Sequence, residues 1–274
     1  MALDISDAFI TQFESEVHVA YQRMGSKLRP LARNITGVTG STARFQKVGT
    51  GTAVTKARNA DVAAMNLTHS SVDVTLSDYY AADYIDRLDE LKTNIDERQV
   101  VALNAAAALG RKTDELITTA LDGTSNTTVH GSAGINTTKI FGVFESMGEN
   151  DVPDDGQRYW VVAPDQWTEL LGITAFADAD FIGSDDLPYK GGMTAKRWLG
   201  YVWMVHSGLP DDGSGNRKTF CWHKSGIGIA TGADIATEVN YVPEKVSNLV
   251  TSMLSQGAVL IDDNAVHEVQ CTES

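Results

Sequence analysis

Residues 93–121 read TNIDERQVVALNAAAALGRKTDELITTAL, and this stretch decides the fold of the chain. Thr93 followed by Asp96 is typical of a helix N-terminal cap, and residues 100–109 are mostly strong helix formers. Gly123 is typical of the residue that follows the C-terminal end of a helix. We therefore expect one helix over residues 93–121, which spans roughly 42 Å at about 1.5 Å per residue. Because its apolar residues lie on several sides, we expect neighbours to cover it on several sides.

The stretch before this helix alternates in hydrophobicity. Apolar residues of one parity recur between residues 71 and 84, with Asp78 as the exception: Val72, Val74, Leu76, Tyr80, Ala82 and Tyr84. Such alternation predicts one long strand with one face buried. Farther upstream, residues 1–33 carry an apolar stripe at helical spacing, which predicts a short helix that docks on another surface. That stripe consists of Phe9, Ile10, Phe13, Val17 and Tyr21.

Residues 23–58 are basic and contain no acid. The whole chain has a formal charge of -14, but this segment holds eight basic residues and not one Asp or Glu. From Leu76 to the end there are fourteen basic and thirty acidic residues, so a positive segment precedes a body of charge -16. The eight basic residues are Arg23, Lys27, Arg29, Arg33, Arg44, Lys47, Lys56 and Arg58.

The basic segment has little with which to build a core. Residues 34–70 are mostly Thr, Gly, Ala and Val, and Phe45 is their only aromatic residue. We expect a two-stranded excursion that leaves along residues 43–48, is interrupted at residues 49–52 and returns toward Met65. A segment that opposes the charge of its own body and cannot bury itself favours contact with another copy of that body. A disordered basic linker or a loose nucleic-acid arm is the alternative.

The second half of the chain mixes strands, short helices and hairpins. Residues 159–163 predict a buried strand that runs into a helix at residues 164–171, which Gly172 ends. We also expect a turn and strand at residues 198–205, a hairpin tip at 211–216, a returning strand at 218–223, strands at 246–256 and 258–261, a turn at 262–264 and a strand at 265–270. No regular βαβ repeat occurs, so the fold class is α+β.

Composition limits the possible partners. A chain of 274 residues with 42% hydrophobic residues can bury a substantial core. The sequence pI of about 4.7 argues against nucleic acid as the partner of the acidic body. The N-terminus lacks the pattern of a signal peptide and no apolar stretch approaches the length of a membrane span, so we expect no membrane partner. Cys221 and Cys271 have no CxxC partner, which favours reduced thiols over a disulfide.

A search for catalytic and ligand-binding motifs finds none. The chain contains no GxGxxG, P-loop, HExxH or GxSxG pattern. Cys221 and His223 could place two metal ligands on one strand face, but no second pair accompanies them. The acid pairs Asp178/Asp180 and Asp211/Asp212 favour solvated turns over calcium loops. The five Trp residues in the second half favour core filling over a pocket. We expect no enzyme activity, no cofactor and no metal.

Three passages of the second half, taken in order after the basic excursion and the long helix, carry a resemblance to a known family. VVAP at residues 161–164 leads into a short helix, RWLGYVWMVHSGLP spans 197–210, and GAVLIDDNAV spans 257–266. They resemble the entry into the axial domain, the "L-x-G-x-P-V-x-x-S-x-x-x-P" passage and the closing hairpin of the major capsid proteins of tailed bacteriophages, the Hong Kong 97-type fold. Val202 stands where that family commonly has Pro. The resemblance covers nearly the whole chain.

This resemblance implies a division of the chain into five segments. They are an N-terminal arm (1–35), an extended basic β-loop (36–70), a peripheral domain (71–155) whose spine helix is residues 93–121, an axial domain (156–245) and C-terminal strands that return to the peripheral domain (246–274). The eight basic residues would then contact a neighbouring subunit. The archetype of the fold joins a loop Lys to an Asn of a neighbour. Nothing in the sequence marks Lys47 or Lys56 as activated for that reaction, so we expect no covalent links.

The implied function is that of a major capsid protein, which self-assembles into an icosahedral shell around a phage genome without catalysis. Its partners would be other copies of itself, in hexamers and pentamers, together with a separate scaffolding protein and a portal; decoration proteins are a further option. It would reside in the virion, and in the host cytoplasm during assembly. No sequence-specific binding of nucleic acid is expected. Two alternatives stay open: an encapsulin-like nanocompartment shell, and an acidic intracellular enzyme with a dispersed active site.

Overall fold

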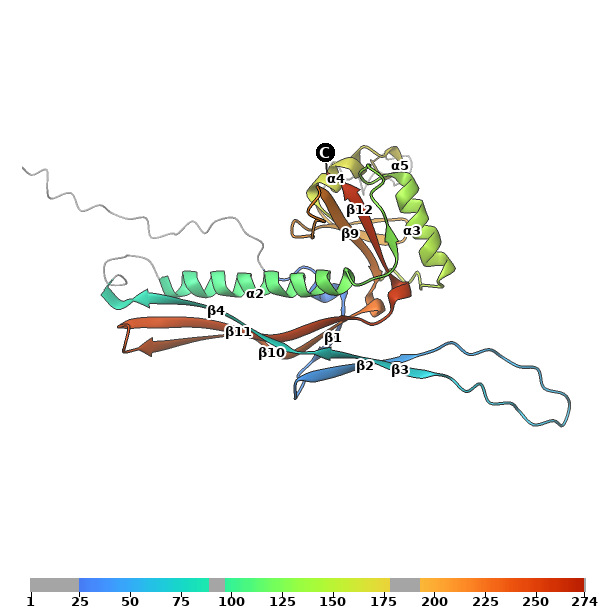
Figure 1. Cartoon of the computed structure of the whole chain (residues 1–274), viewed down its shortest axis with the longest axis horizontal. Coiled ribbons are helices and arrows are strands. Elements are labelled where there is room, and N and C mark those ends of the chain that lie inside the picture. Colours follow the sequence, from blue (N-terminus) through green and yellow to red (C-terminus); the bar gives the residue numbers. More distant parts are fainter. Residues whose placement is uncertain (1–24, 89–96, 178–192, 274) are drawn as a thin grey trace, which may run out of the picture. The chain divides into compact units, whose positions relative to one another are not determined.

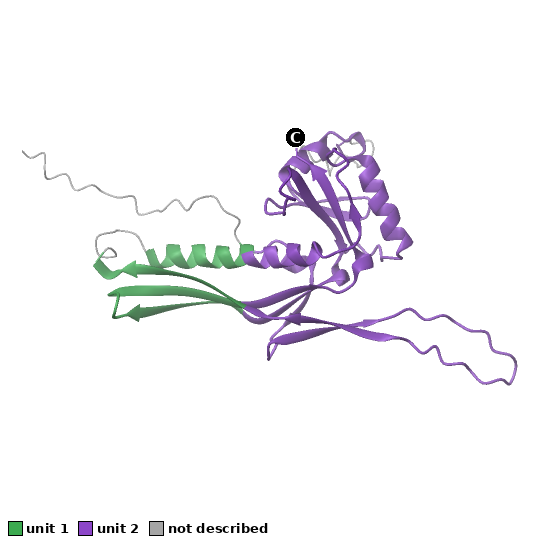
Figure 2. Cartoon of the chain, viewed as in Figure 1, with its two compact units in different colours: residues 1–25, 78–111, 234–254 green, residues 26–77, 112–233, 255–274 purple. Residues whose placement is uncertain are grey.

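The structure, a computed structural model, describes residues 25–88, 97–177 and 193–273. The chain divides into two compact units (Figure 2), unit 1 with residues 1–25, 78–111 and 234–254 and unit 2 with residues 26–77, 112–233 and 255–274. Each unit gathers pieces that are far apart in the sequence, so the five-segment division of the chain remains a prediction. The predicted N-terminal stripe, the cap at Thr93 and Asp96, and the acids between residues 178 and 186 lie outside the described residues.

The centre of unit 2 is a six-stranded mixed sheet (Figure 1). Its strands, in spatial order, are β5 (Thr127–Thr128), β12 (Val266–Thr272), β9 (Asn216–His223), β6 (Arg158–Val162), β8 (Tyr201–Val205) and β7 (Lys196–Trp198). β6 runs parallel to β8, and β12 runs parallel to β5, whereas the other pairs are antiparallel. This confirms the predicted α+β class and the strands predicted around residues 160, 203, 220 and 268.

Both faces of this sheet are buried. Trp160 and Val162 of β6 pack into a core on one face, together with residues of α3 (Thr137–Glu149), α4 (Pro164–Leu171) and α5 (Thr174–Ala177). Val161, between them in the chain, packs into a second core on the other face. The alternation follows from the two-residue period of a strand. Trp160, Trp167, Trp203 and Trp222 are among the largest fully buried side chains, which confirms that the tryptophans fill the core.

The long helix exists and ends where the sequence predicts. α2 spans Glu97–Leu121, and Ile117 and Leu121 at its end are fully buried in the second core. Thr113 of α2 donates a hydrogen bond to Gln256 (2.8 Å), and the amide nitrogen of Gln256 donates to Thr231 (3.0 Å). Because all three side chains are buried, each needs this internal partner in place of water. No helix among the described residues has the length and apolar character that a membrane span requires.

The second sheet has four strands in the order β1 (Arg33–Thr36), β10 (Ile227–Val242), β11 (Ser247–Leu260) and β4 (Ser77–Asp86). The sequence predicted strands at 246–256 and 258–261, separated at Gly257, but β11 is continuous through this glycine. A Cβ atom at Gly257 would lie 2.3 Å from the carbonyl oxygen of Thr75. The glycine therefore permits a close crossing of two chain segments rather than a break in the strand.

The predicted single strand at residues 71–84 is wrong, because the chain changes partner within it. β3 (His69–Thr75) pairs with β2 (Thr42–Val48) in an antiparallel hairpin, whereas β4 starts at Ser77 and lies beside β11. The hydrophobic alternation runs through Leu76 and is interrupted only at Asp78, the second residue of β4, which by itself does not indicate a change of partner. Tyr80 and Tyr84 of β4 are 67% and 45% exposed, so the predicted buried face does not extend to them within one chain.

Candidate assembly surfaces

The base of the β2–β3 hairpin has a small core of its own. Phe45 is fully buried against Val74, Ala230 and Ile261. Gly228 leaves room for it, since a Cβ atom there would lie 2.5 Å from the Phe45 ring. This corrects the expectation that the basic segment has almost nothing to bury. The one aromatic residue of the segment fixes its base, and the rest of the excursion extends from there.

Two of the predicted contact residues are neutralised by acids of the same chain. Arg44 lies opposite Asp73 in the hairpin register and makes a two-pronged ion pair with it, at 2.6 and 2.8 Å. The hydrogen bond from Arg44 lowers the pKa of the Asp73 carboxyl, and the same bond raises the pKa of the Arg44 guanidinium. Lys47 forms an ion pair with Asp262 at 2.7 Å. Antiparallel pairing and the folded base bring these acids close, although they are far away in the sequence.

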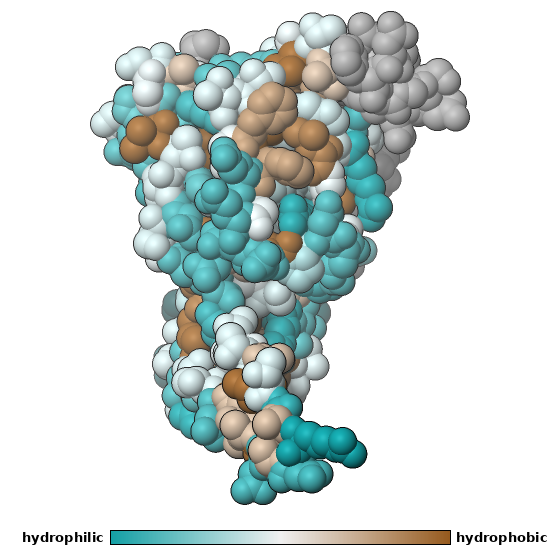
Figure 3. Space-filling view, turned by 90° about the vertical axis from the view of Figure 1, so that its right-hand side faces the viewer, coloured by the Kyte–Doolittle hydropathy of each residue, from teal (hydrophilic) through white to brown (hydrophobic). Residues whose placement is uncertain are grey.

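The outer part of the hairpin carries two bases, Lys56 and Arg58, and one acid, Asp61. The last ladder bond runs from the Gly49 amide to the Thr68 carbonyl (2.8 Å), and every residue from 49 to 68, which we call the outer loop, is exposed. A turn closed by a bond from the Ala60 amide to the Ala57 carbonyl (3.1 Å) forms its tip. Among the described residues, Lys56 and Arg58 at this tip have no ion-pair partner. Figure 3 views the side on which this loop projects, where apolar and hydrophilic side chains lie mixed.

The other predicted contact residues belong to the stretch that precedes β1. Arg23 lies outside the described residues. Lys27 is exposed, and Arg29 begins the short 3-10 helix η2 (Arg29–Leu31), after which Arg33 starts β1. The guanidinium of Arg33 lies 5.7 Å from the centre of the Phe45 ring, a cation–π distance. The structure therefore does not gather the seven described basic residues into one patch: Lys56 and Arg58 lie in the outer loop, whereas the other five lie in β1 and β2 or in the stretch before β1.

A buried carboxylate that sequence reasoning missed holds this stretch to the long helix. Asp114 of α2 accepts hydrogen bonds from the Ser26 hydroxyl (2.6 Å), the Leu28 amide (3.1 Å) and the Lys27 amide (3.3 Å). His206, just after β8, donates a fourth bond from Nε2 (2.9 Å). We call this group the Asp114 junction. Its donors come from two distant segments, so no local motif could have revealed it.

The protonation state of the junction follows from its geometry. Nδ1 of His206 accepts a hydrogen bond from the Gly208 amide (3.2 Å), so Nε2 carries the proton that is donated to Asp114. Burial alone would raise the pKa of Asp114, but the hydrogen bonds from His206, Ser26 and Leu28 outweigh it and hold that pKa below its ordinary value. In a nucleophilic triad the His lies between the Ser and the carboxylate. Here the carboxylate lies between the Ser and the His, so the group joins segments and does not activate Ser26.

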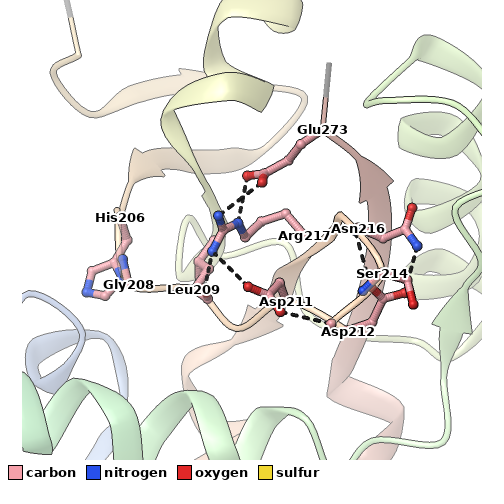
Figure 4. Close-up of polar contacts among 10 residues, drawn as sticks. His206, Gly208, Leu209, Asp211, Asp212, Ser214, Asn216, Arg217 and Glu273 are labelled. Carbon is pink, nitrogen blue, oxygen red and sulfur yellow. Dashed lines mark hydrogen bonds and ion pairs between the residues drawn. The ribbon is translucent and has the colours of Figure 1, made fainter.

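A second ionic cluster fixes the C-terminal strand (Figure 4). Arg217 donates to both carboxylate oxygens of Glu273, at 2.7 and 3.1 Å, and to the Leu209 carbonyl at 2.9 Å. The neighbouring hairpin tip is closed by Asp212, which accepts hydrogen bonds from the Ser214 amide (2.8 Å) and from Asn216. The predicted turn at Asp211 and Asp212 is thus confirmed, since their carboxylates are used within the turn.

Neither cysteine is available for ordinary thiol chemistry. Both are free and buried, and burial raises the pKa of Cys221 far above its usual value and that of Cys271 to about 12. His223 is hydrogen-bonded to Ser225 (2.7 Å) and to Asp155 (3.1 Å). Among residues 25–88, 97–177 and 193–273, no three His, Cys, Asp or Glu side chains form a group that could hold a metal ion.

Comparison with known proteins agrees with the architecture. The fold is similar to that in the capsid structure of the cyanophage P-SCSP1u, with a TM-score of 0.80 and 16% identity over 100% of this chain and 96% of that chain. A structure of Mycobacterium phage Che8 is similar with a TM-score of 0.74 and 16% identity, over 95% and 97% of the two chains. The capsid of the native GTA particle gives 0.72 and 14%, over 97% and 96%. At such identities the likeness concerns the fold, and it is consistent with the Hong Kong 97-type fold that the sequence resembles.

Searching by sequence gives a complementary result. No curated protein matches the chain. A family model, described as phage capsid protein, matches residues 5–273, which is nearly the whole sequence. The chain therefore belongs to the phage capsid protein family.

Proposed function

We propose that this phage capsid protein, a major capsid protein that forms the shell of the phage, holds neighbouring copies together with the tip of its outer loop. The observation that carries the proposal is the pair of exposed bases at the tip, Lys56 and Arg58, which no acid of the same chain engages among the described residues. Their counterpart is the acidic body of another copy, whose charge from Leu76 onward is -16. Family membership favours this phage shell over the nanocompartment and the enzyme that the sequence left open.

Apolar residues on the outer loop support the same proposal. Val54, Val62 and Met65 are 60%, 75% and 54% exposed, far from the buried base at Phe45. A lone chain leaves this apolar area in water, which is unfavourable by roughly 25 cal/mol per Å². A contact that covers the outer loop would gain this energy. The loop therefore combines an apolar contact, which supplies affinity, with a net positive charge, from Lys56 and Arg58 against Asp61, that favours an acidic partner.

Repetition makes small charge effects important in a shell. One exposed ion pair contributes roughly 0–1 kcal/mol. Each subunit of a shell of capsomers repeats the contact, so a weak pair acts many times over the particle. We also propose, from the family alone, that the copies form hexamers and pentamers, that a separate scaffolding protein and a portal take part, and that assembly occurs in the host cytoplasm. Decoration proteins are a further candidate partner.

The test is a charge reversal at the tip. The chain is produced together with its neighbouring scaffold gene, and particles are counted by sedimentation and negative-stain electron microscopy. The wild type should form closed particles. Lys56→Glu/Arg58→Glu should lower the particle yield at least tenfold, while the unassembled subunit keeps its circular dichroism spectrum and its unfolding midpoint.

A matched control exchanges the two charges of the Arg44–Asp73 ion pair in the same hairpin, so that the ion pair is kept. In Arg44→Asp/Asp73→Arg the ion pair is reversed but remains within the chain, so particle yield should stay near that of the wild type. A normal yield from the Lys56/Arg58 variant would show that the tip charges play no part in assembly. A wild-type chain that stays monomeric with every scaffold tried would contradict the shell function itself.

A further inference from the structure

The helix α3 has a second apolar surface, on the side that does not face the core. Ile140, Val143 and Met147 fill the core and are at most 1% exposed. Phe141 and Phe144 lie on the outward side and are 52% and 43% exposed, where a surface helix normally carries polar residues. Figure 3 views the molecule from the side on which α3 lies in Figure 1, and apolar side chains gather in its upper part. Two exposed Phe rings one turn apart indicate a partner that covers them.

The outward side of α3 has the spacing of a helix–helix seam. Four residues recur at intervals of four, three and four positions: Thr137, Phe141, Phe144 and Gly148. A Cβ atom at Gly148, or at the exposed Gly142, would meet no atom within 4 Å. Packing within this chain therefore does not require glycine at either position, although glycine weakens a helix relative to alanine. The open space beside the Phe rings would let a second helix approach closely.

The start of α3 is fixed firmly to the rest of unit 2. The side-chain oxygen of Asn136 caps the helix by accepting a hydrogen bond from the Lys139 amide (3.0 Å). The Lys139 ammonium is buried and donates to the carbonyls of Ala133, Gly134 and Gln270, at 2.7, 2.9 and 2.9 Å. Because Gln270 belongs to β12, these bonds tie the helix to the central sheet. A partner would meet a surface that is already formed, so binding has little ordering cost on this side.

Charge on this surface has one sign. Residues 140–157 contain five acids and no base. Glu145 and Glu149 lie beside the Phe rings along one flank of α3; both are exposed, and no described residue forms an ion pair with either. The surface is therefore aromatic along its centre and acidic along one flank. It fits an amphipathic helix that carries apolar residues on one face and Lys or Arg beside them.

The described helices of a second copy do not have this chemistry. An antiparallel pair of α3 helices would set the two acidic flanks, with Glu145 and Glu149, against each other. α2 carries three acids and three bases, α4 carries two acids and no base, and α5 carries no charge. Residues 1–24 contain four acids and one base, and the basic outer loop is extended rather than helical. A basic helix must therefore come from a different protein.

The small size of the seam indicates a weak and reversible contact. Phe141 and Phe144 together expose about 200 Å², since a whole aromatic side chain buries roughly 150–250 Å². A stable interface buries about 800 Å² on each partner. The flanking charges are exposed, so salt would screen them. Weak binding that is repeated on many copies suits a protein that gathers subunits and then leaves, which is the role of a scaffolding protein.

We propose that the outward side of α3, with Phe141 and Phe144 at its centre, binds a basic amphipathic helix of the separate scaffolding protein. This inference rests on the proposed function, which includes that protein. Apolar side chains of the scaffold helix cover the two Phe rings and approach closely at Gly148. Its Lys and Arg side chains lie along Glu145 and Glu149.

An affinity measurement tests the surface. The unassembled subunit is titrated into the fluorescently labelled, purified product of the neighbouring scaffold gene, and anisotropy is recorded. Phe141→Ala/Phe144→Ala should weaken binding at least tenfold while the circular dichroism spectrum is kept, because both rings are exposed and Ala is the strongest helix former. The matched control Leu103→Ala, at a 46% exposed position on α2, should bind as the wild type does.

The charges are tested separately. Glu145→Lys/Glu149→Lys should weaken binding at least tenfold at about 50 mM salt, and the difference from the wild type should nearly vanish at about 1 M, where screening acts over only about 3 Å. A difference that persists in full at high salt would contradict the proposed role of the acidic flank.

A photochemical cross-link identifies the occupant. Phe141 is replaced with p-benzoyl-phenylalanine, and irradiation of the mixture with the scaffolding protein should join the two chains within a basic, helical segment of the scaffold. The same replacement at Leu103 should give at least tenfold less product. A cross-link to the outer loop of a second copy, or an unchanged affinity of the double Phe variant, would overturn this inference while leaving the shell function standing. Absence of wild-type particles under all conditions would instead refute the shell function.

Discussion

Replacing Asp114 with Asn should destabilise the subunit by about 2–5 kcal/mol, a large effect for the loss of one charge. Oδ1 of Asp114 accepts from Ser26 and Leu28, while Oδ2 accepts from Lys27 and His206. An Asn can keep the first pair with its oxygen, but its NH2 group would then face two donors. Each buried donor left without an acceptor costs about 1–3 kcal/mol, so two fully buried losses would cost about 2–6 kcal/mol. Because the Lys27 amide is only part-buried, we expect the upper end to be about 5 kcal/mol.

The assay is urea unfolding of the unassembled subunit, followed by tryptophan fluorescence. Trp222 is a suitable reporter because its indole nitrogen donates to the Leu31 carbonyl (3.1 Å), next to the stretch that the junction holds. The control is Glu115→Gln, one residue along α2. Glu115 has a 61% exposed side chain paired with Lys112, and its loss should cost less than about 1 kcal/mol. The reasoning fails if the two variants unfold at the same urea concentration.

The junction also predicts a pH dependence with a definite sign. The folded pKa of Asp114 is below its ordinary value, so the carboxylate stabilises the fold fully at pH values above the unfolded pKa. This stabilisation is lost as the pH falls through the lowered, folded pKa. Asp114→Asn lacks this group, so the difference in unfolding free energy between wild type and variant should shrink on acidification below about pH 4. A difference that grows on acidification would refute the assignment of a charged Asp114.

Two further predictions concern the hairpin. Phe45→Ala removes the fully buried ring at the base of the hairpin and should lower the free energy of unfolding by about 3–5 kcal/mol. Gly228→Ala should force that ring outward, so both variants should be cleaved faster between residues 42 and 75 in limited proteolysis. Val48→Ala, at a 51% exposed position, should be cleaved at the wild-type rate. Equal cleavage rates in all three would show that the Phe45 core does not hold the hairpin. Mature particles boiled in detergent should give one band near 29.5 kDa, because Lys47 is paired with Asp262 and Lys56 is exposed in the outer loop. A boiling-resistant ladder that vanishes in Lys47→Ala or Lys56→Ala would contradict this.

Local sequence patterns predicted the elements whose signals are local. The end of α2 at Leu121 and the run from β6 into α4 follow from helix propensity, an initial Pro and a terminal Gly, all of which act within a few residues. Among the elements that the sequence analysis missed are α3 and β10. The helix α3 contains Gly142 and Gly148, which weaken its helical signal, and β10 contains Gly228 and Gly232 within a strand.

The candidate assembly surface likewise has features that the sequence predicts and features that only folding decides. Composition alone located the basic excursion and its opposition to an acidic body, because charge and the lack of apolar residues can be counted along the chain. The returning strand, predicted to run toward Met65, is instead β3 at His69–Thr75. Only the folded chain decided which of those charges remain available. Arg44 meets Asp73 and Lys47 meets Asp262 through strand pairing and a folded base, and these contacts join residues 29 and 215 positions apart. A linear pattern holds no information on such pairings, since packing over long sequence distances selects them.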